Sequence, residues 1–412
     1  MPRGQRRKAR VEGLGDRLTL RVTEMGHQGM GLARNGDEVV WVSLALPGET
    51  VVAEITDRHS TYAEAKTVEV LEASPDRVTP PCPYYGACGG CQFQHIAYPR
   101  QLALKRQVVA DQLRRIGHFA DPPLLDTLPS PDQFHYRNHA RFTVGKFGDL
   151  GFVRRGTHTL IPIEECLLMH AGINRTVAAL RGHCSETRAL NIRYGVNTGD
   201  FLVQPKLKDP EAGVPTGQPS YTEKLLGITF KVASPSFFQV NSRQAERMME
   251  LVRSHLRAGK TDLLVDAYAG VGTFAVLLAP VVGRVIAVEE SPSSVKDARE
   301  NGAAMPNLEF HEGKVEHVLP ELGVQADVVL LDPPRVGCHV RVLQTLADHP
   351  PRQIIYVSCD PATLARDLRI LVDAGFVLES VQPVDLFPQT YHVECVTVLR
   401  WGGAAVETSG KQ

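Results

Sequence analysis

In this 412-residue sequence, Cys359 follows directly after an apolar run and is a candidate for covalent chemistry. Residues 354–357 (Ile-Ile-Tyr-Val) predict a buried strand that stops at Ser358. Asp360 suits the N-cap of a following helix and Pro361 its first turn. Cys359 is therefore expected on a strand-to-helix turn, where the helix N-terminus favours a thiolate over a thiol. The alternative interpretation is a buried, unreactive cysteine beside a sheet.

A glycine-rich turn upstream predicts a nucleotide-type site. Residues 270–275 satisfy G-x-G-x-x-A after a strand predicted at 263–266, and the strand predicted at 285–289 ends in Glu289, where an acid binds a ribose hydroxyl. This pattern allows either NAD or S-adenosylmethionine. Asp266 precedes the turn, where a carboxylate can meet the ammonium group of the methyl donor.

A second acidic strand end favours the methyl donor over NAD. Asp332-Pro333-Pro334 ends the strand predicted at 327–332, a pattern typical of methyltransferases that act on planar bases. Amine methylation normally places an aromatic residue after the prolines, whereas Arg335 stands here and favours methylation of carbon. Strands and helices alternate around these motifs, which predicts a doubly wound α/β sheet over residues 226–402, with a helix at 242–258 stopped by Gly259.

The first part of the chain has a different pattern. Short strands predicted at 18–22, 38–42 and 50–55, separated by glycine, proline and Asn-Gly turns, indicate a small β-barrel over residues 13–73. The stretch Gly26–Arg34 resembles the start of a TRAM domain, an RNA-binding barrel of the OB type. Residues 1–12 are predicted to be a disordered basic arm and 403–412 a tail.

Three cysteines follow the barrel with metal-ligand spacing. Cys82, Cys88 and Cys91 form C-x5-C-x2-C in a Gly/Pro-rich loop, and Cys166 is the candidate for a fourth ligand. Four thiolates suit an iron–sulfur cluster or zinc, and the spacing leaves both open. The alternative is a set of inert cysteines. The spacing is not that of radical S-adenosylmethionine enzymes.

The central region, residues 74–225, combines this cysteine cluster with β-rich sequence. A helix is predicted at 99–118, with basic residues on one side and an apolar side that could pack on the catalytic domain. Residues 136–142 interleave basic and aromatic side chains, which suits RNA and equally suits an ordinary strand with exposed arginines. Residues 205–220 predict a loop or linker.

Composition limits the class of protein. Forty-five Lys and Arg balance 46 Asp and Glu, for a net charge of −1, so a nucleic-acid site must come from local basic clusters. No apolar run could span a membrane and no secretory signal is evident, so we expect a cytoplasmic, monomeric protein.

Taken together, the motifs resemble the RNA uracil-5-methyltransferase family, in its branch that makes 5-methyluridine in 23S ribosomal RNA. The resemblance rests on Ser234-Pro235, Phe237, Gln239-Val240-Asn241, Asp266–Gly270, Asp332–Arg335, Ser358–Asp367 and His392-Val393-Glu394, and the TRAM-like and cysteine motifs extend it over nearly the whole chain. Asp360 departs from it, because the family usually has asparagine there. That extra negative charge would raise the pKa of Cys359 unless something offsets it.

The resemblance implies roles for individual residues. Cys359 would attack carbon 6 of a uracil, and Glu394 would remove the proton from carbon 5, with His392 as a rival base. The residues implied to line the donor or target-base pocket are Gln239, Tyr268, Gly270, Thr273, Glu289, Lys314 and Asp332, with Lys314 near the adenine. Cys82, Cys88, Cys91 and Cys166 would hold a 4Fe-4S cluster with a structural or RNA-contacting role.

The implied partner is RNA, with the target uridine flipped into the α/β domain. A uridine of 23S ribosomal RNA is favoured, and the T-loop uridine of transfer RNA is the alternative. Two other readings remain: an RNA-binding iron–sulfur protein without methyltransferase activity, which the presence of Cys359 and Glu394 disfavours, and an amine-directed base methyltransferase, which would not need Cys359.

Overall fold

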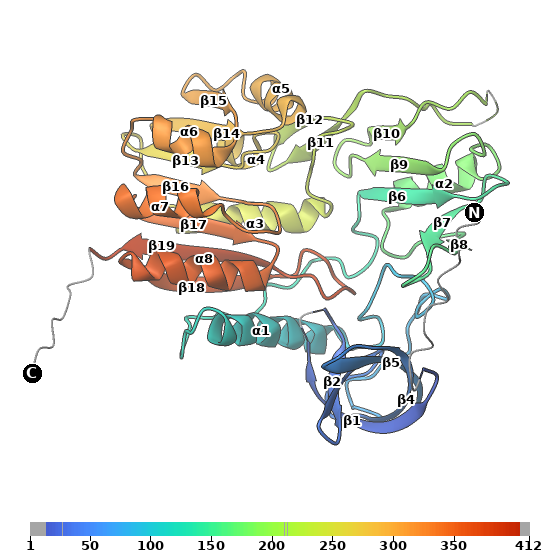
Figure 1. The fold of residues 1–412 in the computed structure, drawn as a ribbon. Coiled ribbons are helices and arrows are strands. Elements are labelled where there is room, and N and C mark those ends of the chain that lie inside the picture. The colour runs from blue at the N-terminus through green and yellow to red at the C-terminus, as the bar shows by residue number, and fades with distance from the viewer. Residues whose placement is uncertain (1–13, 27, 210, 212, 404–412) are drawn as a thin grey trace, which may run out of the picture. The chain divides into compact units, whose positions relative to one another are not determined.

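The structure, a computed structural model, describes residues 14–26, 28–209, 211 and 213–403 (Figure 1). The predicted basic arm and all but the first residue of the predicted tail lie outside the described residues. The chain forms two compact units. The first comprises residues up to Gly86, Gly90–Leu104 and Gln389–Tyr391, and the second comprises Ala87–Gly89, Lys105–Pro388 and the residues from His392. The predicted boundaries at 73, 225 and 402 remain predictions.

The first unit contains a closed five-stranded barrel in the order β1-β2-β3-β5-β4. Its strands are β1 (Arg17–Met25), β2 (Gly31–Asn35), β3 (Glu38–Ser43), β4 (Thr50–Arg58) and β5 (Tyr62–Glu72). Alternate side chains such as Leu20, Val22, Val40 and Val42 point inward and are buried, as the period of two in these strands requires. The predicted small barrel is confirmed.

The second unit begins with a five-stranded sheet in the order β10-β9-β6-β7-β8. Its elements are β6 (His139–Val144), β7 (Leu150–Val153), β8 (Leu160–Pro162), β9 (Ala189–Tyr194), β10 (Phe201–Gln204) and the helix α2 (Ala171–Leu180). Helix α2 packs beside β9. The described residues between β10 and β11 (205–209, 211 and 213–219) form no regular element, and the hairpin of β11 (Ser220–Leu225) and β12 (Ile228–Ala233) follows.

A seven-stranded sheet is the centre of the second unit, in the order β15-β14-β13-β16-β17-β19-β18. The strands are β13 (Leu263–Ala267), β14 (Arg284–Glu289), β15 (Leu308–Glu312), β16 (Val328–Leu331), β17 (Gln353–Ser358), β18 (Phe376–Val384) and β19 (Glu394–Trp401). The first five named are parallel, and β19 joins β17 and β18 antiparallel. The predicted doubly wound α/β domain is confirmed.

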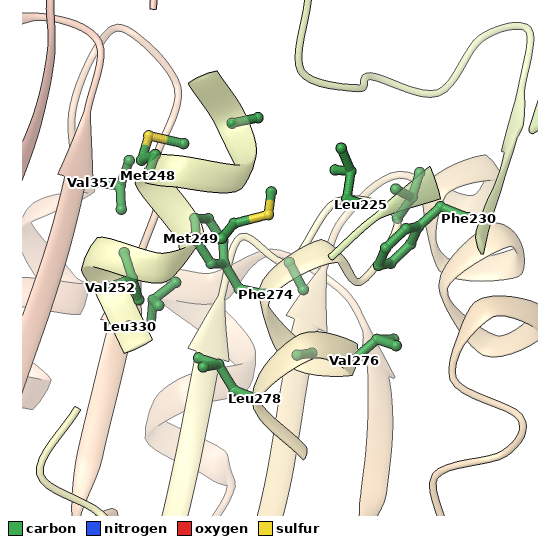
Figure 2. Packing of buried hydrophobic residues seen from close by; sticks show 14 of the residues in the cluster. Leu225, Phe230, Met248, Met249, Val252, Phe274, Val276, Leu278, Leu330 and Val357 are labelled. Atoms are coloured by element: carbon green, nitrogen blue, oxygen red, sulfur yellow. The ribbon is translucent and has the colours of Figure 1, made fainter. Parts of the chain in front are cut away.

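Helices cover both faces of this sheet. One face packs on α3 (Ser242–His255) and α4 (Thr273–Leu278), where Met248, Met249 and Phe274 meet Leu330 and Val357 of the strands (Figure 2). The other face packs on α6 (Val315–Glu321), α7 (Val340–Asp348) and α8 (Pro361–Asp373). The 3-10 turn η1 (Ala279–Val281) and α5 (Pro292–Asn301) complete the unit. Both strand faces are buried, as expected for parallel strands.

Two predicted helices end earlier than expected. Helix α1 spans Tyr98–Arg115 instead of 99–118, because the left-handed His118 (φ 54°) turns the chain after Gly117. Helix α3 ends at His255 instead of residue 258, because Leu256 adopts extended geometry. Val109 and Leu113 of α1 pack in the core of the second unit, as the apolar side of the predicted helix suggested. Among the described helices, none has the length and apolarity needed to cross a bilayer.

A buried ion pair ties the second half of α1 to the segment after β18. Lys105 and Asp385 are both almost fully buried, and Lys105 Nζ lies 2.5 Å from Asp385 Oδ1. The same ammonium donates a hydrogen bond to the carbonyl of Phe387. Because either charge would be costly to bury alone, each requires the other.

We expect Lys105→Met to lower the free energy of unfolding by about 3–5 kcal/mol, because it leaves the Asp385 carboxylate buried without its countercharge. Urea unfolding followed by circular dichroism measures the change. The control is Lys231→Met, which breaks the exposed Lys231–Glu300 pair and should leave the urea midpoint nearly unchanged. An equal, small effect of both variants would contradict the role given to Lys105.

Candidate active site

The predicted site residues lie at one edge of the large sheet. In the parallel ladders, Ala267 pairs with Val288 and Leu331, and Leu331 pairs with Tyr356. The strand ends that carry Glu289, Asp332 and Cys359 therefore lie at the carboxyl edge that begins after Ala267. This edge is where open α/β sheets bind ligands.

The turn that carries Cys359 has the predicted local structure. The strand β17 is buried along its whole length, and α8 begins directly at Pro361. Asp360 is the N-cap, and its Oδ1 accepts hydrogen bonds from the backbone N–H groups of Ala362 and Thr363 at 3.0 Å each. Cys359 is thus fixed between a rigid strand and a capped helix.

Antiparallel pairing brings Glu394 to Cys359. The last ladder pair of β17 and β19 joins Ser358 to Cys395, so Glu394 stands across from Cys359 one step further on. The side chain of Glu394 is buried, and burial raises the pKa of its carboxyl to about 8, with Asp332 adding to the rise and Arg335 opposing it. A carboxyl that titrates near neutral pH suits general acid–base work.

The helix N-terminus behind Cys359 is expected to favour a thiolate, and burial of the side chain acts against that form. Burial raises the pKa of Cys359 to about 12, and the negative charge of Glu394 adds to the rise. Arg335 is the group that opposes it. Asp360 also raises the pKa of Cys359 but has the smallest of these effects, less than that of Arg335. Loss of hydration therefore opposes the helix end.

Arg335 faces this group of acids from the loop that follows β16. Its positive charge lowers the pKa of both Cys359 and Glu394. An Nη2 atom of Arg335 lies 3.4 Å from Nδ1 of His392, the predicted rival base. His392 also contacts the ring of Phe387 edge-on. The sequence motif indicated Arg335 only as a sign of carbon methylation and gave no signal that its charge acts on Cys359 and Glu394.

The predicted donor turn has space beside its first glycine. Gly270 adopts φ 57°, and a Cβ placed there would meet no atom within 4 Å among the described residues. Its N–H donates to Glu289 Oε2 at 2.9 Å, while Glu289 Oε1 accepts from Ser291 at 2.8 Å. Each carboxylate oxygen keeps a further lone pair for a ligand hydroxyl. The turn enters α4 at Thr273.

Two carboxyls near this turn, those of Asp266 and Asp332, have raised pKa values. Asp266 is fully buried, and neither carboxylate oxygen has a hydrogen-bond partner among the described residues, although the Ala275 N–H acts on it from the start of α4. Burial, followed by the charge of Asp332, raises the pKa of Asp266 well above its usual value. Asp332, a partly exposed residue, has a pKa raised by burial of its carboxyl to about 7. A cationic ligand such as S-adenosylmethionine fits these acids.

The remaining predicted pocket residues lie around the same domain. Tyr268, at φ 69°, stands between Asp266 and the glycine turn. Lys314 is exposed at the N-cap of α6, two residues beyond the pairing of Glu289 with Glu312. Gln239 is half-buried, and its backbone carbonyl accepts a hydrogen bond from the side-chain amide of Asn138. Their roles in binding remain predictions.

The structure does not bring the four predicted metal ligands, Cys82, Cys88, Cys91 and Cys166, together as a metal site among the described residues. Among the described residues, no group of three or more His, Cys, Asp or Glu side chains is arranged to hold a metal ion. Cys82 and Cys91 belong to the first compact unit, and Cys88 and Cys166 to the second. Within the second unit, the backbone of Cys166 is held in a turn by Asn174, which bonds both its N–H and its carbonyl.

Comparison with known families gives two matches. Residues 224–311 and 321–401 match the family described as tRNA (Uracil-5-)-methyltransferase. Residues 11–68 match the TRAM domain. The first match includes the donor turn, Cys359 and Glu394, and the second includes most of the barrel.

Curated relatives and a solved structure extend the likeness over the chain. An uncharacterized RNA methyltransferase of Thermosynechococcus vestitus is 34% identical, covering 93% of this chain and 98% of the relative. One from Halalkalibacterium halodurans is 32% identical, with 93% and 97% covered. The structure of Pyrococcus abyssi tRNA (uracil-54, C5)-methyltransferase with S-adenosyl-L-homocysteine is similar with a TM-score of 0.77 and 26% identity, covering 92% of this chain and 99% of that one.

We expect Asp360→Asn to speed alkylation of Cys359 by iodoacetamide at fixed pH by less than about tenfold. The amide keeps an oxygen for the helix cap and removes the smallest of the negative charges that raise the Cys359 pKa. Mass spectrometry of the peptide containing Cys359 measures the rate between pH 7 and 10. Asp373→Asn, at the exposed far end of α8, is the control. Slower alkylation in Asp360→Asn would show that the cap matters more than the charge.

Proposed function

Because the chain belongs to the RNA (uracil-5-)-methyltransferase family, which uses S-adenosylmethionine, we propose that Cys359 and Glu394 together methylate carbon 5 of a uridine. The observation that carries this proposal is their meeting across β17 and β19, beside the acids of the donor turn. A thiol and a carboxyl at that place can supply the two functions that carbon methylation of uracil needs.

The reaction proceeds through a covalent bond to Cys359. The thiolate adds to carbon 6, and the displaced electron pair makes carbon 5 nucleophilic, with charge on the carbon-4 oxygen. Carbon 5 then takes the methyl group, and S-adenosylhomocysteine leaves. Glu394 removes the proton from carbon 5, the electrons re-form the double bond to carbon 6, and the thiolate is expelled. The cycle thus restores the Cys359 thiolate and the double bond between carbons 5 and 6, and the proton from carbon 5 is left on Glu394.

The electrostatics of the site set the protonation states for these steps. Glu394 can act as a base only when ionised, so the proton-removal step gains rate as the pH rises through its pKa of about 8 in the ligand-free protein. Cys359 must lose a proton against a raised pKa. Both pKa values fall when positive charge is brought near, as Arg335 already does and a sulfonium donor would do.

The donor is held by the residues of the glycine turn and the acids around it. Asp266 would meet the ammonium group, and Glu289 the ribose hydroxyls, with Gly270 giving the room for close approach. Tyr268, Thr273 and Asp332 are proposed to line the donor or target-base pocket. Gln239 and Lys314 complete the proposed set, Lys314 at the adenine.

The RNA is proposed to be 23S ribosomal RNA, bound in part by the TRAM barrel, with the target uridine flipped out. The cysteine motif supports this choice, since it resembles that of the ribosomal branch. The T-loop uridine of transfer RNA is the second candidate. The similarity of this chain to the Pyrococcus abyssi transfer RNA enzyme over 92% of its length favours that alternative.

The four cysteines are proposed to ligate a 4Fe-4S cluster that supports the fold or the RNA contact. The support is the spacing of Cys82, Cys88 and Cys91 and the rigid turn at Cys166. The described side chains are not arranged as a metal site. The proposed cluster has a structural or RNA-contacting role and takes no part in the methyl transfer.

The first test uses RNA transcripts that contain 5-fluorouridine. Fluorine cannot leave as a proton does, so the covalent bond to Cys359 persists and a protein–RNA adduct survives a denaturing gel. We expect an adduct with 23S transcripts that requires S-adenosylmethionine and is lost in Cys359→Ala. Cys184→Ala, a buried cysteine of the central sheet region, is the control.

The other outcomes of this test separate the alternatives. An adduct formed only with transfer RNA would keep the chemistry and change the substrate. Methylation of RNA that continues in Cys359→Ala would contradict the thiolate mechanism and favour an amine or ribose methyltransferase.

The cluster is tested on protein purified without oxygen. We expect about four iron atoms per chain and visible absorbance near 400 nm, both lost when Cys82 and Cys91 are changed to serine, because thiolates are the ligands of such clusters. Stoichiometric zinc without iron would replace the cluster by a zinc site. If the protein contains neither iron nor zinc, the cysteines do not have the proposed role.

A further inference from the structure

The polar face of α8 that follows the nucleophile has no role in the function proposed so far. Thr363, Arg366 and Asp367 stand three and four residues apart, so they lie on one face of the helix. All three contact residues 335–338, which continue from the Asp332-Pro333-Pro334 motif. The helix that begins two residues after Cys359 therefore also holds the segment that contains Arg335.

Asp367 is the fully buried centre of this contact. Its Oδ2 accepts hydrogen bonds from the backbone N–H of Cys338 at 2.8 Å and from the hydroxyl of Tyr356 at 2.7 Å. Its Oδ1 accepts from Arg366 Nε at 2.8 Å. Charge-assisted bonds of this kind are among the strongest in proteins. The carboxylate joins β17, α8 and the segment after β16.

Arg366 and Thr363 hold the two preceding residues of the segment. Arg366 Nη2 donates to the carbonyl of Val336 at 3.0 Å, and Thr363 Oγ1 donates to the carbonyl of Arg335 at 3.2 Å. Gly337, which lies between Val336 and Cys338, has φ 78°, and a Cβ there would lie 2.5 Å from Arg366 Nη2 and 2.7 Å from Asp367 Oδ2. The contact is closed so tightly that only glycine fits.

The same contact continues toward the donor turn. The hydroxyls of Tyr356 and Tyr268 both act on the thiol of Cys338 and lower its pKa, and Tyr268 belongs to the predicted donor motif. Asp367 thus stands between the segment that positions Arg335 and a residue proposed to line the donor pocket. A shift of this carboxylate would move both.

We propose that Thr363, Arg366 and Asp367 are positioning residues that hold Arg335 at the distance from Cys359 and Glu394 that the reaction needs. The inference rests on the proposed function for its catalytic consequence, while the positioning itself can be tested without RNA. Interaction between charges varies inversely with their separation, so the effect of the guanidinium depends on where its backbone is fixed. Helix α8 fixes the nucleophile and this backbone in one rigid body.

The test measures the reactivity of Cys359, and every charged group near that thiol can change the reactivity by shifting the pKa of Cys359. The groups that face it are Glu394 and Cys395 of β19, Asp332 and Arg335 after β16, and the cap Asp360. His392 lies beside Arg335. None of the variants chosen below replaces any of these groups except Arg335 itself.

The test compares the pH dependence of Cys359 alkylation in Arg366→Met, Thr363→Val and Arg335→Gln. Arg366 and Thr363 are chosen because they are less buried than Asp367. We expect both variants to slow alkylation between pH 7 and 10, in the direction of Arg335→Gln. In the Arg335→Gln background, Arg366→Met should have little further effect, because the charge being positioned is gone. Arg366→Lys should restore part of the rate.

A matched control lies one turn along the same helix. Arg369 pairs with Asp373 and stacks on Phe119, so Arg369→Met removes an arginine of α8 without touching residues 335–338. It should leave the alkylation profile unchanged. If Arg366→Met slows alkylation equally with and without Arg335, or only as much as Arg369→Met, these residues merely brace the helix and the proposal is overturned.

The catalytic consequence is measured with the 5-fluorouridine RNA. We expect Arg366→Met to slow adduct formation about 10- to 100-fold at saturating RNA and donor, as misplacement of a catalytic group by an ångström does. A wild-type protein that forms no adduct would overturn the proposed function, and with it the catalytic consequence of the positioning. Normal adduct formation in Arg366→Met, with the wild type active, would overturn the positioning proposal alone.

Discussion

Loss of hydration at the carboxyl edge of the large sheet is the constraint on which the site depends. Burial is the largest influence on Asp266, Asp332, Cys359 and Glu394, and in each it raises the pKa. Negative charges packed this closely further oppose each other. Such groups stay protonated at higher pH than usual unless a positive charge lowers their pKa values. Arg335 is a residue of the protein that supplies this positive charge to Cys359 and Glu394.

This constraint explains how one edge can serve two ligands. The orphaned carboxylate oxygens of Asp266 suit the cationic end of a methyl donor, and the charges of Asp332 act on both Asp266 and Glu394. A donor that neutralises Asp332 would therefore lower the pKa of the base as well. In the proposed mechanism, binding of the donor and the pKa of Glu394 are therefore linked through the carboxyl of Asp332.

The fold meets the constraint by joining distant segments rigidly. Cys359 and Glu394 come from strands that are adjacent in the sheet but separated by α8 and β18 in the chain. Helix α8 is capped by Asp360 beside the nucleophile and is bonded through Asp367 to the segment of Arg335. The ion pair of Lys105 and Asp385 secures the segment that leads from β18 toward Glu394. Each charged or reactive group is fixed by a neighbour from another element.

The sequence by itself determined the fold class, the family and the turn that bears Cys359. Local patterns suffice there, because strand burial, the Asp360 cap and Pro361 act within a few residues. The ends of α1 and α3 were predicted a few residues too far along the chain, since backbone geometry at His118 and Leu256 ends them. The opposition of burial to a Cys359 thiolate could not be read from the sequence, because burial is set by the whole fold. Only the tertiary structure could bring Arg335 near Cys359 and Cys338 to Asp367, since these residues are more than twenty positions apart in the chain.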